Sequence, residues 1–256
     1  MPRLVHGAMT EFPFIRMPPD LSTEDMAAVD RAMVEDYGIE LVQMMENAGR
    51  CLALVAGSRF LAGDPRGRRV TVLAGSGGNG GGAMVAARRL ADWGAEVDVR
   101  LSTDEERLQP VSAHQLTILR HLEITVAEAA KAGSGESVGE TDLIIDGLIG
   151  YSLVGAPHGA AAELIEAANE SDAAVLSLDV PSGLVASSGA VHEPTMRASA
   201  TLTLALPKHG LLSERVREIV GELYLADIGV PPTLYAKLGL EDPGPLFATG
   251  DIVRLL

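Results

Sequence analysis

Short apolar runs of strand length recur along the chain, and most of them are bounded by Gly, Asp, Ser or Pro. They are Val70–Ala74, Val97–Leu101, Leu143–Ile145, Ala174–Leu178, Ala200–Leu206 and Leu223–Ala226. Several are apolar throughout instead of alternating, which is typical of strands covered on both faces. The pattern predicts a buried, mostly parallel sheet.

Segments with the period of an amphipathic helix lie between these runs. They are Met84–Trp93, Ser112–His121, Ala160–Asn169 and Glu214–Val220, and the first ends at Gly94, a plausible C′ glycine. Strands that alternate with helices pair in parallel through right-handed crossovers. The chain is therefore predicted to have an α/β fold.

Two further helices are predicted ahead of the first strand. Ser22 with Asp25 three residues later resembles a helix N-cap, and this helix runs to about Tyr37 before Gly38 breaks it. A second helix is expected over about residues 40–60.

The domain organisation is predicted to be simple. Residues 1–20 contain four prolines and read as an N-terminal arm that packs on a partner subunit, and 21–256 read as a single domain. Residues 127–141 are the most linker-like stretch, and we expect a surface loop between a helix and a strand there.

Composition excludes several classes of protein. Hydrophobic residues make up 47% of the 256, which is ample for a core. The net charge of −15 disfavours nucleic acid and anionic membranes as partners. One cysteine, Cys51, cannot form an internal disulfide, no apolar run reaches the length of a membrane span, and the six histidines include no close pair that would suggest zinc. We therefore expect a cytoplasmic protein.

A glycine-rich turn follows the first strand and precedes a helix. It reads Gly75-Ser76-Gly77-Gly78-Asn79-Gly80-Gly81-Gly82, and it matches the dinucleotide fingerprint G-x-G-x-x-G. Residues without Cβ let backbone N–H groups approach a phosphate or ribose closely, and the helix dipole favours an anion there. The alternative is a plain turn of small residues. A dehydrogenase is disfavoured because Asp98 lies inside the second strand, not at its tip.

Two later strands end in acids. Asp146 follows Leu143–Ile145, and Asp179 follows Ala174–Leu178 and precedes Ser182. If the three strands are neighbours, these residues and Asn79 converge on one crevice at the carboxyl ends of the strands. An amide, a carboxylate and a hydroxyl suit an alkali or alkaline-earth cation, and a second carboxylate can shuttle protons. The alternative for each acid is a turn or helix-cap residue.

At this point the chain resembles the NAD(P)H-hydrate epimerases, the YjeF N-terminal domain family. The resemblance rests on six segments in order: Met45–Gly49, Gly75–Gly82, Ile144–Gly150, Asp179–Gly183, Leu206–Leu211 and Ala226–Pro231. It covers about residues 20–235. It implies a Rossmann-like three-layer α/β/α sandwich, a homodimer, and an isomerase that interconverts the R and S forms of hydrated NADH and NADPH for cofactor repair.

The resemblance also assigns roles to residues. It places K⁺ on Asn79, Asp146 and Ser182 and makes Asp179 both the catalytic residue and a substrate contact. The other substrate contacts that it implies are Gly78, Asn79, Gly80, Gly81 and Gly82 of the turn, and Gly150, Tyr151, Ser152, Leu153, Val154, Gly155 and Ala156 of a loop. The residues alone leave two questions open: whether Tyr151 and Ser152 contact the ligand or shape the loop, and whether Lys208 is functional or a solvated loop lysine.

One departure from the family keeps an alternative open. The family turn usually reads Asn-Asn-Gly-Gly-Asp-Gly, whereas Gly78 stands here in place of its first Asn and Gly82 in place of its Asp. The alternative function is a non-catalytic module of the same fold that binds a nucleotide-like ligand. The dehydratase domain that often follows in this family has no room in 256 residues, so we expect no dehydratase activity.

Overall fold

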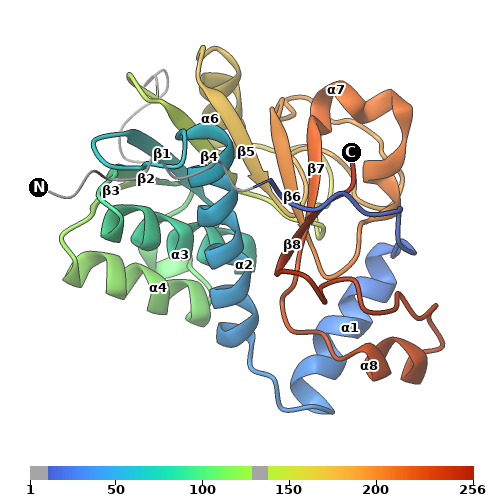
Figure 1. Cartoon of the computed structure of the whole chain (residues 1–256). Coiled ribbons are helices and arrows are strands. Elements are labelled where there is room, and N and C mark those ends of the chain that lie inside the picture. The colour runs from blue at the N-terminus through green and yellow to red at the C-terminus, as the bar shows by residue number, and fades with distance from the viewer. Residues whose placement is uncertain (1–10, 129–137) are drawn as a thin grey trace, which may run out of the picture.

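The computed structural model describes residues 11–128 and 138–256, and an eight-stranded sheet runs through them (Figure 1). The strands are β1 (Arg69–Ala74), β2 (Glu96–Leu101), β3 (Thr125–Glu128), β4 (Leu143–Gly147), β5 (Ala174–Leu178), β6 (Ala200–Leu204), β7 (Glu222–Ala226) and β8 (Ile252–Arg254). They lie in the order β3-β2-β1-β4-β5-β6-β7-β8. Every neighbouring pair is parallel except β7 and β8. The mostly parallel α/β sheet predicted from the sequence is confirmed.

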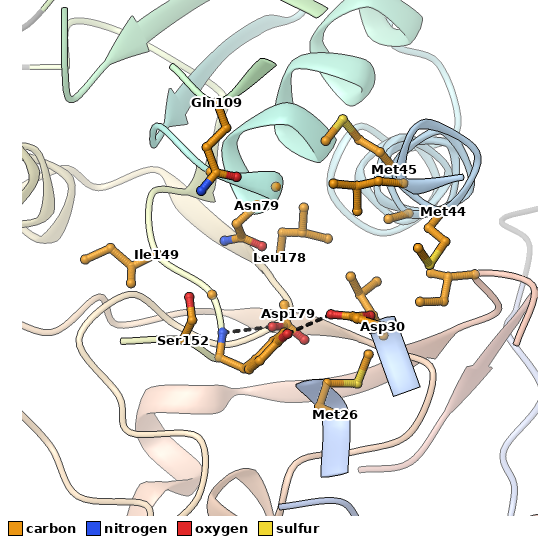
Figure 2. A pocket seen from close by; sticks show the side chains of 18 of the residues that line it. Met26, Asp30, Met44, Met45, Asn79, Gln109, Ile149, Ser152, Leu178 and Asp179 are labelled. Atoms are coloured by element: carbon orange, nitrogen blue, oxygen red, sulfur yellow. Dashed lines mark hydrogen bonds between the residues drawn. The ribbon is translucent and has the colours of Figure 1, made fainter. Parts of the chain in front are cut away.

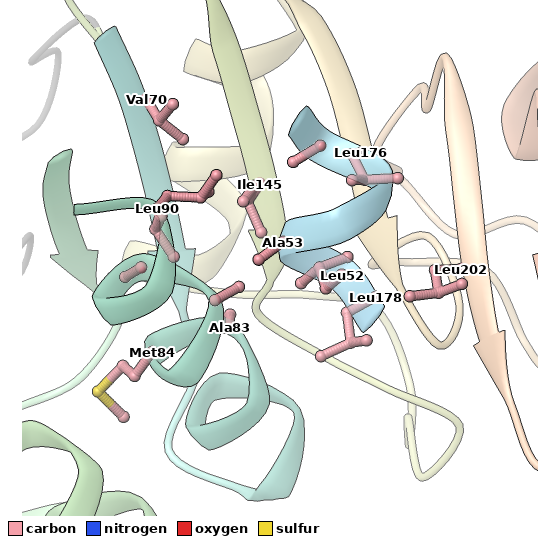
Figure 3. Packing of buried hydrophobic residues seen from close by; sticks show 14 of the residues in the cluster. Leu52, Ala53, Val70, Ala83, Met84, Leu90, Ile145, Leu176, Leu178 and Leu202 are labelled. Carbon is pink, nitrogen blue, oxygen red and sulfur yellow. The ribbon is translucent and has the colours of Figure 1, made fainter. Parts of the chain in front are cut away.

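Helices cover both faces of the sheet and make three layers. One face carries α2 (Leu41–Val55), α3 (Gly78–Asp92) and α4 (Pro110–His121), and the other carries α6 (Ala160–Asn169) and the short α7 (Arg217–Val220). Figure 3 shows Leu52 and Ala53 of α2 and Ala83 of α3 packed against Ile145 and Leu178 of the sheet. Of the helices in the two described ranges, none combines the length and apolarity needed to cross a membrane.

This double cover explains why the strands are apolar throughout. In β1, Val70 and Val72 pack under α2 and α3, whereas Leu73 packs on the α6 side. Ile145 and Ile144 of β4 divide in the same way. Each such side chain contributes roughly 1.5–3 kcal/mol when it is fully buried, so a polar residue on either face of these strands would be costly.

The N-terminal helix α1 (Thr23–Glu35) forms a smaller apolar cluster with α8 (Pro232–Lys237). The predicted cap is present: the Ser22 hydroxyl accepts a hydrogen bond from the Asp25 amide at 3.0 Å, and Asp25 accepts one from the Ser22 amide at 3.2 Å. Gly38, at φ +66°, follows the helix as predicted. Figure 1 shows α1 and α8 set apart from the helices that cover the sheet.

Several predicted boundaries are wrong. The second helix covers the predicted range, although its last turn, Ala56–Phe60, is π-helical, whereas β6 ends at Leu204, two residues early. The segment Glu214–Val220 is a 3-10 turn followed by α7. Strands β3 and β8 and helix α8 were not predicted, because three to six residues are too few to show a periodicity. The predicted loop at 127–141 begins inside β3, and most of the rest lies outside the described residues.

The described part of the N-terminal arm packs on its own chain. The Ile15 amide donates to the Arg254 carbonyl at 3.1 Å, and the Arg254 amide donates to the Pro13 carbonyl at 2.9 Å, so the arm lies beside β8. Phe12 makes an edge-on contact with Tyr224, with ring centroids 5.5 Å apart. Packing of the arm on a partner subunit stays a prediction.

The glycine-rich turn is tighter than the sequence indicated, because α3 begins at Gly78 and not after the glycines. A Cβ on Gly75 would lie 1.9 Å from the Leu148 carbonyl oxygen, and a Cβ on Gly80 would lie 2.0 Å from the Gly75 carbonyl oxygen. Close packing of the backbones therefore overrides the low helix propensity of glycine here. The turn connects β1 to α3 and packs against the loop that follows β4.

We expect Gly75→Ala to lower the free energy of unfolding by about 1–3 kcal/mol, because its methyl group would meet backbone that cannot move aside. Gly78→Ala is the matched control, since nothing lies within 4 Å of its added Cβ, and we expect a change within about 1 kcal/mol. Urea unfolding of both variants measures the difference. Equal stability of the two would contradict the packing described here.

Candidate active site

A cavity of about 460 Å³ opens at the carboxyl ends of β1, β4 and β5 (Figure 2). These strands are neighbours, and the chain order of the sheet reverses between β1 and β4. Ligands in open parallel sheets bind at such a switch point. The lining of the cavity is mixed: the polar residues are Asp30, Asn79, Tyr151, Ser152, Asp179 and Lys208, and apolar residues include Met26, Leu41, Met44, Met45, Ala48 and Ile228.

A buried ion pair between Asp179 and Lys208 forms part of the cavity lining. Asp179 follows β5 at φ +67°, a conformation that few residues other than glycine adopt. The Lys208 Nζ donates to Asp179 Oδ1 at 2.5 Å and to the Leu204 carbonyl at 2.9 Å. The Lys208 side chain is fully buried, so Lys208 is not the solvated loop lysine that the sequence left possible. The strained backbone of Asp179 and the burial of the Lys208 side chain together indicate that this pair has a role in function.

Leu21, just before the N-cap of α1, fixes the backbone around Lys208. The Leu21 amide donates to the Pro207 carbonyl at 2.9 Å, and the His209 amide donates to the Leu21 carbonyl at 3.1 Å. Leu21 and Lys208 therefore form a parallel β-bridge. The side chain of His209, by contrast, is 69% exposed.

Tyr151 links the carboxylates of Asp179 and Asp30 through two hydrogen bonds. Its amide donates to Asp179 Oδ2 at 3.0 Å, and its hydroxyl donates to Asp30 Oδ2 at 2.7 Å, as the dashed lines in Figure 2 show. Burial raises the pKa of the Tyr151 hydroxyl above its usual range. Burial also raises the pKa of Asp30, and the Tyr151 hydrogen bond and the Lys208 charge oppose that rise.

Sequence reasoning missed Asp30. The available signal was its place on α1, where Met26, Val29 and Met33 are buried and an acid stands among them. A polar residue beside the apolar face of an amphipathic helix needs a partner, and that partner comes from a distant loop.

Asp146 lies beneath the cavity floor and does not line it. Its carboxylate accepts four hydrogen bonds: from the Ser182 hydroxyl at 2.6 Å, the Ser177 hydroxyl at 2.8 Å, the Ser182 amide at 2.9 Å and the Leu148 amide at 3.2 Å. Burial raises its pKa, and these hydrogen bonds oppose the rise. The Ser182 hydroxyl also accepts from the Ile149 amide at 2.9 Å. Asp146 and Ser182 thus hold the loop formed by residues 148–150.

Asn79 meets the same loop from α3. A Cβ on Gly150 would lie 3.1 Å from Asp179 Oδ2 and 3.3 Å from Asn79 Cγ. Within the described part of the chain, the buried Asn79 Nδ2 has no hydrogen-bond partner. The four residues that the sequence placed in one crevice therefore do gather around loop 148–150, two above it and two beneath.

The predicted substrate contacts divide into three groups. Gly78, Asn79, Gly150, Tyr151, Ser152 and Asp179 line the cavity. Gly80, Gly81 and Gly82 are buried in the packing of α3, where added Cβ atoms would lie 2.0, 2.5 and 2.9 Å from Gly75, Met45 and Leu178. Leu153, Val154, Gly155 and Ala156 continue the loop outside the cavity lining, and Val154 is 92% exposed.

Comparison with known proteins gives a consistent match. Residues 41–210 match the family model described as YjeF-related protein N-terminus. A protein of Dehalogenimonas lykanthroporepellens named NAD(P)H-hydrate epimerase is 46% identical over 231 residues, which cover 90% of each chain. One of Rhodopirellula baltica with the same name is 33% identical and covers 89% of this chain and 91% of its own.

Longer relatives match over part of their length. The protein named bifunctional NAD(P)H-hydrate repair enzyme Nnr from Hyperthermus butylicus is 37% identical over 87% of this chain and 40% of its own. Among solved structures, yeast ynu0, YNL200c, superimposes with a TM-score of 0.76 and 25% identity, over 93% of this chain and all of that one.

We expect Lys208→Met to lower the free energy of unfolding by about 3–5 kcal/mol, because it leaves the buried Asp179 carboxylate without its cation. In Asp179→Asn/Lys208→Met both charges are gone, so the loss should be smaller than the sum of the two single losses. Lys237→Met is the control: its pair with Asp36 is exposed, and we expect less than about 1 kcal/mol. Urea unfolding of these three variants and of Asp179→Asn alone measures the losses. A loss in Lys208→Met no greater than in Lys237→Met would show that the buried pair is not stabilising.

Proposed function

The chain belongs to the family of YjeF-related protein N-termini, and we propose that it is an NAD(P)H-hydrate epimerase, an isomerase that interconverts the R and S forms of hydrated NADH and NADPH. The observation that carries this proposal is the Asp179–Lys208 pair, which faces a cavity at the switch point of a Rossmann-like sheet. The two relatives of similar length that carry this name cover most of the chain.

The pair is suited to the chemistry of a hydrated nicotinamide ring. Protonation of the C6 hydroxyl lets water leave as the lone pair of the ring nitrogen forms an iminium cation, and water then adds to either face and gives up a proton. Asp179 is the proposed catalytic residue: it exchanges the proton and stabilises the cation through its negative charge. Over the cycle one proton goes to the departing hydroxyl and one returns from the entering water, so the Asp179–Lys208 pair ends in the protonation state in which it began.

The cavity walls support the placement of the ring. Met26, Met44 and Met45 add flexible apolar surface to the cavity lining, and thioether side chains adapt to rings of irregular shape. Gly78 and Asn79 open α3, so their free amides and the helix dipole favour an anionic group of the substrate. We propose that Gly150, Tyr151 and Ser152 close the same space from the opposite side.

We also propose that K⁺ binds at Asn79, Asp146 and Ser182. The donor set fits, since it supplies amide, carboxylate and hydroxyl oxygens, and rotation of the unpartnered Asn79 amide would present Oδ1 to a cation. The described residues hold no cluster of three His, Cys, Asp or Glu side chains, so a transition metal has no support here. Bound K⁺ would supply a fixed positive charge that holds loop 148–150 and the substrate hydroxyls.

A second function is favoured by one observation. At Gly82, where the family turn carries Asp, an added Cβ would meet Leu178 Cδ2 at 2.9 Å, and Leu178 lines the cavity. The wall is apolar at that point, which suits a module that binds a nucleotide-like ligand without turnover. Beyond the reaction itself, we propose a homodimer, a cytoplasmic location, and one domain over 21–256 behind the arm at 1–20.

The function is tested by supplying the R hydrate of NADH together with a dehydratase that accepts only the S form. We expect this protein to accelerate the recovery of NADH absorbance, and Asp179→Asn to abolish the acceleration by removing the proton carrier, a loss of about 10²–10⁴-fold. No acceleration by the folded wild-type protein would contradict the epimerase. Thermal stabilisation by NADH without turnover would then favour the binding module.

Removal of K⁺ tests the cation site. We expect the melting temperature and the epimerase rate to fall when K⁺ is replaced by choline, because a cation that binds the native state stabilises it by mass action. Asn79→Ala should remove this dependence of the melting temperature. A melting temperature that is the same in both salts, for the wild type and the variant alike, would argue against the site.

A further inference from the structure

We propose that Asp30 is a positioning residue for the epimerase reaction: it fixes Tyr151, and Tyr151 in turn sets the orientation of the Asp179 carboxylate. The inference rests on the proposed function and adds to it a residue of α1, an element that contributes no motif to the predicted site. Its role is mechanical. Asp30 acts through Tyr151 and not on the reacting atoms.

Both oxygens of Asp179 are held, and by different parts of the chain. Lys208 holds Oδ1 at 2.5 Å from the segment that follows β6. The Tyr151 amide holds Oδ2 at 3.0 Å from the loop that follows β4. A carboxylate fixed at two points has one orientation toward the cavity, and either point, if it moves, turns the plane of the carboxylate.

The backbone at Tyr151 needs an anchor of its own. Gly150 before it has no side chain, and Val154 three residues later is almost wholly exposed. The Tyr151 ring is therefore what ties this part of the loop to the body of the protein: it packs on the apolar cluster of α1 and α8, and the Lys208 ammonium lies 5.9 Å from its centroid. Its hydroxyl ends on Asp30 Oδ2 at 2.7 Å.

Burying the carboxylate of Asp30 costs free energy that a purely structural position would not require. Burial raises its pKa, because a carboxylate there loses solvation, and the negative charge of Asp179 adds to the rise. Met26, Val29 and Met33 of α1 already bury apolar surface in the same cluster, so α1 does not depend on an acid for docking. The carboxylate gives the tyrosine hydroxyl a charged acceptor, which makes a stronger and more directional hydrogen bond than a neutral one.

The test is a double-mutant cycle in the coupled epimerase assay. We expect Asp30→Ala and Tyr151→Phe each to lower kcat about 10- to 100-fold with KM within twofold, because the carboxylate is displaced while the binding surface remains. The double variant should be no slower than either single one. Asp30→Asn should have a kcat between those of the wild type and Asp30→Ala, since its amide oxygen still accepts the hydrogen bond but lacks the charge that strengthens it. Asp36→Ala, at the exposed end of the same helix, is the control and should leave kcat unchanged.

Three results would overturn the proposal: wild-type kcat in Tyr151→Phe, losses that multiply in the double variant, or an Asp30→Asn as slow as Asp30→Ala in a folded protein. Should Asp30→Ala fail to fold, Tyr151→Phe and Asp30→Asn still decide, because they remove a single atom or a charge. If the wild type itself shows no epimerase activity, the proposed function fails first. Hydrogen exchange at the Tyr151 amide then tests the link alone: faster exchange in Tyr151→Phe supports it, and unchanged exchange refutes it.

Discussion

The buried ion pair between Lys208 and Asp179 is the interaction on which the site depends. Moving both charges out of water is costly, and the pair is tolerable only with good geometry and further hydrogen bonds. The structure provides these: Leu204 offers a carbonyl to the ammonium, and Tyr151 offers an amide to the carboxylate. These two hydrogen bonds and the ion pair itself together offset the hydration that the two charges lose on burial.

The sheet topology decides where this unit forms. The order of strands reverses between β1 and β4, so the loops after them diverge and leave a space that a continuous winding would fill. Gly75 lets the turn after β1 pass directly against Leu148, and Asp146 holds that loop from beneath. Loop 148–150 is thus fixed from two sides before any ligand binds, which favours a preformed cavity.

Most strands and the position of the crevice could be predicted from local sequence pattern. The features that could not be predicted share a physical reason. Apolar runs bounded by small residues located six of the eight strands, and the acids at two strand ends identified the crevice, because both signals are local in the sequence. Asp30 and the burial of Lys208 depend on contacts between distant segments, which leave no spacing to read. The glycines of the turn were interpreted as ligand contacts, whereas packing of α3 on its neighbours accounts for Gly80, Gly81 and Gly82.

The bridge between Leu21 and Lys208 has a consequence for how the site forms. It joins the residue before the N-cap of α1 to the segment that follows β6, so it is among the most non-local pairings in the described residues. Closing so long a loop has an entropic cost that the contacts of the folded sheet must offset. The position of the Lys208 ammonium beside its carboxylate therefore depends on a contact that exists only when these distant segments of the chain have come together.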